Sequence, residues 1–84
     1  MFYVYLIRND KQGWYIGSTN DLKRSMLERN SGKNFSTKYA KNWKLIYYEA
    51  YIDEFCARIR EKKLKSFGNA FGHLLKRLSI KREG

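Results

Sequence analysis

Two short aromatic stretches near the start of the chain constrain its fold more than any other feature. They lie at residues 3–5 and 15–17 and read Tyr-Val-Tyr and Tyr-Ile-Gly, with turn-forming residues between them at positions 9–13. Aromatic and β-branched residues favour strands, so the sequence predicts a hairpin that brings the tyrosines side by side. Because side chains alternate along a strand, Tyr3, Tyr5 and Ile7 share one face. We expect that face to carry a row of phenol groups and the opposite face to join the core.

Hydrophobic periodicity and helix-capping residues predict the other elements. The expected strands are Phe2–Arg8, Trp14–Ser18 and Lys44–Tyr51, and the expected helices are Asn20–Arg29, Glu54–Phe67 and Ala70–Ile80. This order of two strands, a helix, a strand and two helices predicts an α+β fold. We expect a small, mainly antiparallel three-stranded sheet flanked by helices, in one domain over residues 1–84.

The charge balance indicates the kind of partner. Eighteen lysines and arginines against eight acidic residues give a net charge of +10, which is typical of proteins that meet polyanions. Solvated lysines that serve only solubility are the alternative. The single cysteine excludes an internal disulfide, and with the single histidine it cannot build a zinc site. No secretory signal or membrane-spanning run is evident, so we expect a cytoplasmic protein with no membrane partner.

The second predicted helix places charged residues on its apolar side. A wheel of that helix puts Glu61 at the edge of the expected buried stripe and Arg60 nearer its centre. A partly buried carboxylate needs a cation or several hydrogen-bond donors. Either a metal ion or a structural ion pair with Arg60 or a lysine would meet that need. The stripe itself is expected to comprise Cys56, Ala57, Leu64 and Phe67, with Ile59 at one edge.

Four features in order along almost the whole chain carry a resemblance. They are the two tyrosine motifs, the ten-residue step from Tyr5 to Tyr15, the helix opening Thr-Asn-Asp-Leu at residues 19–22, and Arg-Glu-Lys-Lys-Leu-Lys at residues 60–65. Together they resemble the GIY-YIG endonuclease superfamily, in its short, stand-alone bacterial branch. The second motif matches fully, whereas the first has Tyr3 in place of the initial glycine.

The resemblance implies metal-dependent hydrolysis of phosphodiester bonds. By its pattern, Tyr5 takes a proton from the attacking water, Tyr15 helps to place the water or the phosphate, and Glu61 binds one Mg²⁺ or Mn²⁺. A single carboxylate suits such an ion, which keeps several waters and shares phosphate oxygens. DNA is the favoured substrate over RNA. Both tyrosines also have a simpler explanation, because aromatic residues on strands usually serve packing.

The chain departs from the superfamily pattern on the first helix. The arginine expected ten residues after Tyr15 is replaced by Ser25, with Arg24 one position earlier. The next family position, usually His or Tyr, holds Arg29, which shares a helical face with Ser25. Arg24 and Arg29 are therefore candidate substitutes for the missing cation. An impaired nuclease and a non-catalytic nucleic-acid-binding module on the same scaffold are both consistent with this pattern, and a basic RNA-associated protein is a third hypothesis.

Further basic and aromatic residues are candidates for nucleic-acid contact. We expect phosphate contacts from Lys33, Lys38, Lys41, Lys44, Arg58, Lys62 and Lys65, with Phe35, Tyr39 or Trp43 stacking on bases. A solvated loop is the alternative for these residues. Two other reactive residues receive no catalytic role in this interpretation, since His73 is expected at the surface or at the boundary of the core, and Cys56 in the core.

Overall fold

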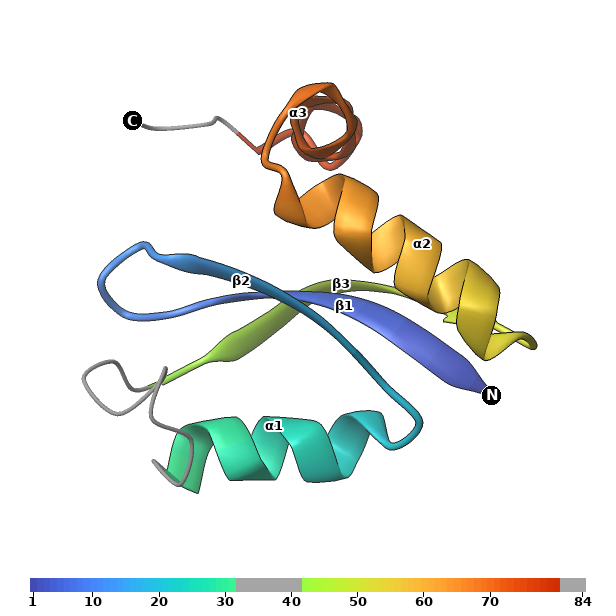
Figure 1. The fold of residues 1–84 in the computed structure, drawn as a ribbon. Helices are drawn as coiled ribbons and strands as arrows, with labels where there is room; N and C mark the ends of the chain where they lie inside the picture. The colour runs from blue at the N-terminus through green and yellow to red at the C-terminus, as the bar shows by residue number, and fades with distance from the viewer. Residues whose placement is uncertain (32–41, 81–84) are drawn as a thin grey trace.

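The computed structural model describes residues 1–31 and 42–80, which contain three strands and three helices. An antiparallel sheet in the order β2-β1-β3 has α1 on one face and α2 and α3 on the other (Figure 1). The predicted α+β fold and element order are therefore confirmed. None of these helices is long and apolar enough to cross a membrane. The elements are β1 (Phe2–Arg8), β2 (Trp14–Thr19), α1 (Leu22–Ser31), β3 (Lys44–Tyr51), α2 (Glu54–Lys65) and α3 (Asn69–Arg77).

The hairpin between β1 and β2 is closed by the side chain of Asn9. Its Oδ1 accepts hydrogen bonds from the backbone N–H groups of Lys11 at 2.9 Å and Gly13 at 2.8 Å. A Cβ atom at Gly13 would lie 2.8 Å from Asn9 Nδ2, so a larger residue there would displace the side chain that closes the turn. The turn fixes the strand register, which pairs Tyr5 with Gly17 and Ile7 with Tyr15.

The helices differ from the predicted ranges at their ends. Asp21 caps α1, because its Oδ1 accepts from the Arg24 N–H at 3.0 Å, and the helix therefore begins at Leu22 rather than Asn20. Helix α2 ends at Lys65 because Phe67 adopts a left-handed backbone conformation with φ 53°. Ser79, with φ 59°, ends α3 in the same way before the predicted limit. A side-chain cap at the start of α1 and left-handed backbone conformations at the ends of α2 and α3 thus override hydrophobic periodicity.

Both faces of the sheet are covered. The core between the sheet and α2 and α3 contains Val4, Leu6, Ile16, Ala57, Leu64, Phe71, Leu74 and Leu75. On the opposite face, Tyr5, Ile7 and Trp43 are buried beneath α1. The Asn30 side chain ties α1 to the start of β3 by hydrogen bonds to the Trp43 backbone at 2.8 and 3.1 Å. The predicted alternation on β1 is correct, and the face that carries Tyr5 is covered by α1, which the sequence did not indicate.

Helix α2 buries a narrower stripe than predicted. Ala57 and Leu64 are buried, but Cys56 and Phe67 are exposed. Cys56 lies one residue from Ala57, which turns it by about 100° away from the sheet. Phe67 lies beyond the end of the helix and packs against Phe71, with ring centroids 4.8 Å apart. The expectation that Cys56 is a core residue is therefore wrong.

Candidate active site

The hairpin register places Tyr5 directly against a glycine. A Cβ atom at Gly17 would lie 2.5 Å from the Tyr5 hydroxyl oxygen and 2.7 Å from Cζ, closer than real side chains approach. Gly17 therefore lets the phenol lie over the β2 backbone. The Tyr5 residue is only 3 % exposed, and its ring lies 6.2 Å from that of Tyr15. The two motif tyrosines are thus brought together, as the hairpin prediction expected.

Two cations approach the Tyr15 ring from different helices. The Arg29 Cζ atom from α1 lies 3.6 Å from the ring centroid, and Lys65 Nζ from α2 lies 5.8 Å from it. Trp43 meets the same ring edge to face at 6.2 Å. Because a cation over an aromatic face is attracted by the ring quadrupole, Tyr15 helps to hold Arg29 at this position. One side chain from each of the two helices on opposite faces of the sheet therefore reaches the Tyr15 ring on the outer strand β2.

A small pocket opens beside these groups on the α1 side. Its volume is about 170 Å³, and its lining comprises Tyr5, Ser18, Ser25, Glu28 and Arg29. Burial raises the pKa of the Tyr5 phenol, while a hydrogen bond with the Arg29 guanidinium and its positive charge act in the opposite direction. Tyr5 is thus a neutral phenol at neutral pH that faces a fixed cation.

Glu61 on α2 reaches the end of β2. Its Oε1 accepts a hydrogen bond from Ser18 Oγ at 2.7 Å, and its Oε2 lies 2.8 Å from Lys65 Nζ. The Glu61 side chain is 18 % exposed. Burial acts to raise its pKa, but hydrogen bonds from Lys65 and Ser18 outweigh this effect and the pKa lies below its usual value. The carboxylate is therefore ionised and held beside a residue that also lines the Tyr5 pocket.

Arg60 does not serve as the partner of Glu61. Its Nε and Nη2 atoms lie 3.0 and 3.1 Å from the carboxylate oxygens of Glu49 on β3. The hydroxyls of Tyr47 and Tyr51 also donate to Glu49, at 2.8 and 2.5 Å. This cluster binds α2 to β3 and fixes the rotation of the helix that carries Glu61. Sequence reasoning missed Glu49 and also the contact between Ser18 and Glu61, which lie 43 residues apart.

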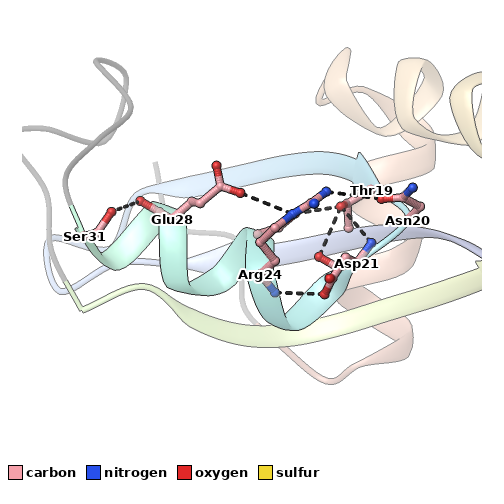
Figure 2. Close-up of polar contacts among 7 residues, drawn as sticks. Thr19, Asn20, Asp21, Arg24, Glu28 and Ser31 are labelled. Atoms are coloured by element: carbon pink, nitrogen blue, oxygen red, sulfur yellow. Dashed lines mark hydrogen bonds and ion pairs between the residues drawn. The ribbon is translucent and has the colours of Figure 1, made fainter.

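Ser25 stands where the resemblance predicts an arginine, and the two candidate substitutes on α1, Arg24 and Arg29, lie in different places. Ser25 Oγ donates to Thr19 Oγ1 at 2.7 Å and lines the pocket. Arg24 lies on the exposed side of α1, with Nε 3.6 Å from Glu28 and Nη2 3.4 Å from Asn20 (Figure 2). Of the two candidate substitutes, Arg29 lines the pocket with Tyr5, whereas Arg24 does not line it and instead pairs with Glu28 at the pocket's rim.

The other residues predicted to contact nucleic acid differ in their exposure and in whether the structure describes them. Lys33, Phe35, Lys38, Tyr39 and Lys41 lie outside the described residues. Trp43 is buried, so the prediction that it stacks on bases is wrong. Lys44 and Lys62 are exposed, as is His73, while Arg58 pairs with Glu54 at 3.3 Å.

The site fits a metal ion only of a particular kind. Within residues 1–31 and 42–80, no group of three or more His, Cys, Asp or Glu side chains is placed to hold a metal ion. Glu61 offers one ionised carboxylate, whose oxygens keep spare lone pairs beside the bonds to Ser18 and Lys65. Mg²⁺ is commonly bound through one or two carboxylates together with substrate phosphates. The residues present therefore fit an ion shared with a substrate, and do not form an all-protein cage.

Comparisons with known proteins agree with this arrangement. The chain matches the GIY-YIG catalytic domain over residues 1–73, which include both tyrosine motifs and Glu61. It is 29 % identical to the UPF0213 protein HQ_3675A of Haloquadratum walsbyi, over 77 % of this chain and 74 % of that protein. No solved structure matches the chain significantly.

Proposed function

Since the chain belongs to the GIY-YIG catalytic domain family, whose function is of the nuclease type, we propose that it hydrolyses phosphodiester bonds in DNA. The observation that carries this proposal is the meeting of Tyr5, Tyr15, Arg29 and Glu61 around the outer edge of β2. These residues come from two strands and two helices. Packing of the core alone requires neither an ionised carboxylate nor a cation over Tyr15 at this edge.

Glu61 would hold one Mg²⁺ or Mn²⁺ in this proposal. Ser18 holds one carboxylate oxygen of Glu61 by a hydrogen bond. Lys65 pairs with the other oxygen and would move from it to the negatively charged substrate phosphate, which frees that oxygen for the ion. The bound ion would polarise the phosphate and acidify a bound water. Tyr5 orients the attacking water through its hydroxyl. It accepts the water's proton only as the phenolate, after its own proton has passed to solvent, and the positive charge of Arg29 favours that loss. Tyr15 positions Arg29 through its ring.

Arg29 takes the role of the family arginine that Ser25 cannot fill. Its guanidinium lines the pocket with Tyr5, where it can donate to the oxygens of a phosphate. Loss of one preorganised donor at such a site commonly lowers the rate by about 100- to 1,000-fold. We therefore expect Arg29→Ala to reduce cleavage by about that factor and Arg24→Ala, which removes an equal charge from the exposed side of α1, to have little effect.

A cleavage assay tests the proposal. Purified protein is incubated with branched, flapped and nicked DNA in the presence of Mg²⁺ or Mn²⁺, and Glu61→Gln is compared with the wild type. Asp10→Asn, an acidic residue in the exposed hairpin turn, is the matched control. Cleavage that disappears with Glu61→Gln and persists with Asp10→Asn supports the nuclease. Equal cleavage by the wild type and Glu61→Gln would refute the assigned role of Glu61.

One observation favours a second candidate, a non-catalytic module that binds nucleic acid. Lys65 already neutralises Glu61 at 2.8 Å, as in an ordinary structural ion pair. Such a module would bind DNA equally with and without Mg²⁺ and would cleave none of the substrates. A protein that only binds RNA would prefer structured RNA and would be indifferent to Glu61→Gln.

A further inference from the structure

A line of charged residues extends the candidate site along α2. Glu54, Arg58, Glu61 and Lys65 follow one another at helical spacings of four, three and four residues and share one face. They form two ion pairs, at 3.3 Å between Arg58 and Glu54 and at 2.8 Å between Lys65 and Glu61. The positive charge of Arg58 also contributes to the lowered pKa of Glu61. The first pair is therefore the continuation of the Glu61 site toward the start of α2.

A second pocket lies beside this first ion pair. Its volume is about 300 Å³, and its polar lining includes Ser18, Asn20, Glu54 and Arg58, while Phe2 and Ala57 supply apolar surface. The start of β1, the end of β2 and the first turns of α2 lie at the same end of the molecule (Figure 1). Ser18 lines both pockets and donates to Glu61 at 2.7 Å. The second pocket is thus next to the candidate active site, with one residue between them.

We propose that this second pocket receives the base of an unpaired nucleotide next to the phosphate at Glu61, and that guanine fits it best. The inference rests on the proposed function, because a phosphate at Glu61 is what brings a neighbouring nucleotide to Arg58. Arg58 and Glu61 are three positions apart, which is a rise of about 4.5 Å along the helix axis. A volume near 300 Å³ is at the lower end of ordinary small-ligand pockets and accommodates one base.

The chemistry of the pocket favours a base over a second phosphate. Glu54 lies 3.3 Å from Arg58, so the pair has no net charge and its carboxylate repels phosphate oxygens. Donors and acceptors lie side by side in this pair, as hydrogen bonding to a base edge requires. The Phe2 ring supplies an aromatic surface for the flat face of a base.

Guanine is the base whose edges suit both charged groups. Its O6 and N7 atoms form a pair of acceptors that a guanidinium binds in bidentate fashion. Its N1–H and exocyclic amino group form a pair of donors that one carboxylate accepts together. Thymine offers neither pair of edges. Because Watson–Crick pairing occupies the N1–H and the amino group of guanine, the nucleotide in this pocket must be unpaired. Single strands and flaps are therefore the substrate class that this pocket selects, and continuous duplex is not.

The test measures binding rather than cleavage. Fluorescence anisotropy of the full chain, with Ca²⁺ in place of Mg²⁺ so that a phosphate can be bound at Glu61 while cleavage is suppressed, compares a short thymidine oligonucleotide with versions that carry one guanine, adenine or cytosine. We expect the guanine version to bind about tenfold more tightly than the thymidine one. Glu54→Gln and Arg58→Gln should each abolish that difference. Lys63→Gln changes the same charge as Arg58→Gln from another side of α2 and should preserve the preference.

Three results would overturn the pocket. The first is equal affinity for all four oligonucleotides, and the second is a guanine preference that survives both substitutions. The third is an Arg58→Gln protein that loses affinity for all four oligonucleotides equally, as removal of a phosphate contact would cause.

Binding and cleavage can fail separately in this design. A protein that prefers guanine through Glu54 and Arg58 but cleaves nothing retains the pocket and loses the proposed nuclease activity, and one that cleaves without preference does the reverse.

Discussion

The ion pair between Glu49 and Arg60 is expected to be a main support of the site, because it joins β3 to the helix that carries Glu61. Arg60→Met leaves the Glu49 carboxylate with two phenol donors and no cation. Glu49→Leu leaves an uncompensated guanidinium. Removal of one partner of a fully buried pair costs about 3–5 kcal/mol. The two side chains here are 24 % and 14 % exposed, so we expect each substitution to cost about 2–3 kcal/mol.

A double-mutant cycle isolates the interaction energy between Glu49 and Arg60 from the effects of each substitution on other neighbours. Glu49→Leu with Arg60→Met replaces both charges by apolar groups, which is often nearly neutral for a buried pair. We expect its cost to fall at least about 2 kcal/mol short of the sum of the two single variants. Urea denaturation of the four proteins gives the four free energies of unfolding. Additive costs, or single costs below about 0.5 kcal/mol, would refute the idea that this pair holds α2 in place.

A matched control is available on the same helix. Arg58 and Glu54 form an i, i+4 pair whose side chains are 69 % and 56 % exposed. The same cycle on this pair is expected to give a coupling of no more than about 0.5 kcal/mol. A similar coupling in both cycles would show that exposure is not what distinguishes the two pairs.

The same pair predicts how stability depends on pH. Burial acts to raise the pKa of Glu49, but hydrogen bonds from Arg60, Tyr51 and Tyr47 outweigh it and the pKa lies below its usual value. The folded state therefore holds this carboxylate ionised at a pH where the unfolded chain protonates it. Its contribution to stability is complete above the unfolded pKa of about 4.3 and is lost as the pH falls through the folded pKa. The unfolding free energy of the wild type should therefore fall relative to that of the double variant over that acidic range.

Three further predictions concern other parts of the site. Burial, followed by the bond to Glu49, raises the pKa of Tyr51 to about 12, so an ultraviolet titration should show a phenol that ionises there and is absent from Tyr51→Phe. The stability linked to that proton should be complete below about pH 10 and be lost as the pH rises toward 12. Gly17→Ala should cost about 1–3 kcal/mol in urea denaturation, because its Cβ would displace the Tyr5 ring, and a smaller cost in a Tyr5→Ala background would confirm this cause. Ser25→Arg should restore cleavage to Arg29→Ala, and failure to do so would show that the two positions are not equivalent.

The fold could be predicted largely because its signals are local. Alternation on β1 assigned Val4 and Leu6 to one face and Tyr5 and Ile7 to the other, and the structure agrees. The ends of the helices could not be located this way, because they depend on single backbone conformations such as that of Phe67. The packing of α1 on the face that carries Tyr5 and Ile7 was not predicted, for a similar reason. Strand alternation shows that two faces differ, but it does not show whether a helix covers each of them.

The contacts of the site were predictable only within one element. The ion pair between Glu61 and Lys65 follows from their i, i+4 spacing on α2. The hydrogen bond from Ser18 and the pairing of Arg60 with Glu49 join distant segments, and no periodicity indicates them. Sequence position indicated that Glu61 needs a partner, and tertiary packing decided which residue serves.

The position of Arg29 illustrates how a site could keep its charge when a family residue is lost. Residues four apart on a helix lie on one face, so Ser25 and Arg29 both border the pocket. The short Ser25 side chain turns to Thr19, which leaves the space beside Tyr5 to a longer side chain from the next turn. Tyr15 then holds the guanidinium at 3.6 Å. On this argument Arg29→Lys should restore little of the cleavage lost in Arg29→Ala, because a lysine keeps the charge but lacks the planar fork that stacks on Tyr15 and binds two phosphate oxygens. Full activity of Arg29→Lys in the cleavage assay would mean that charge alone suffices at this position.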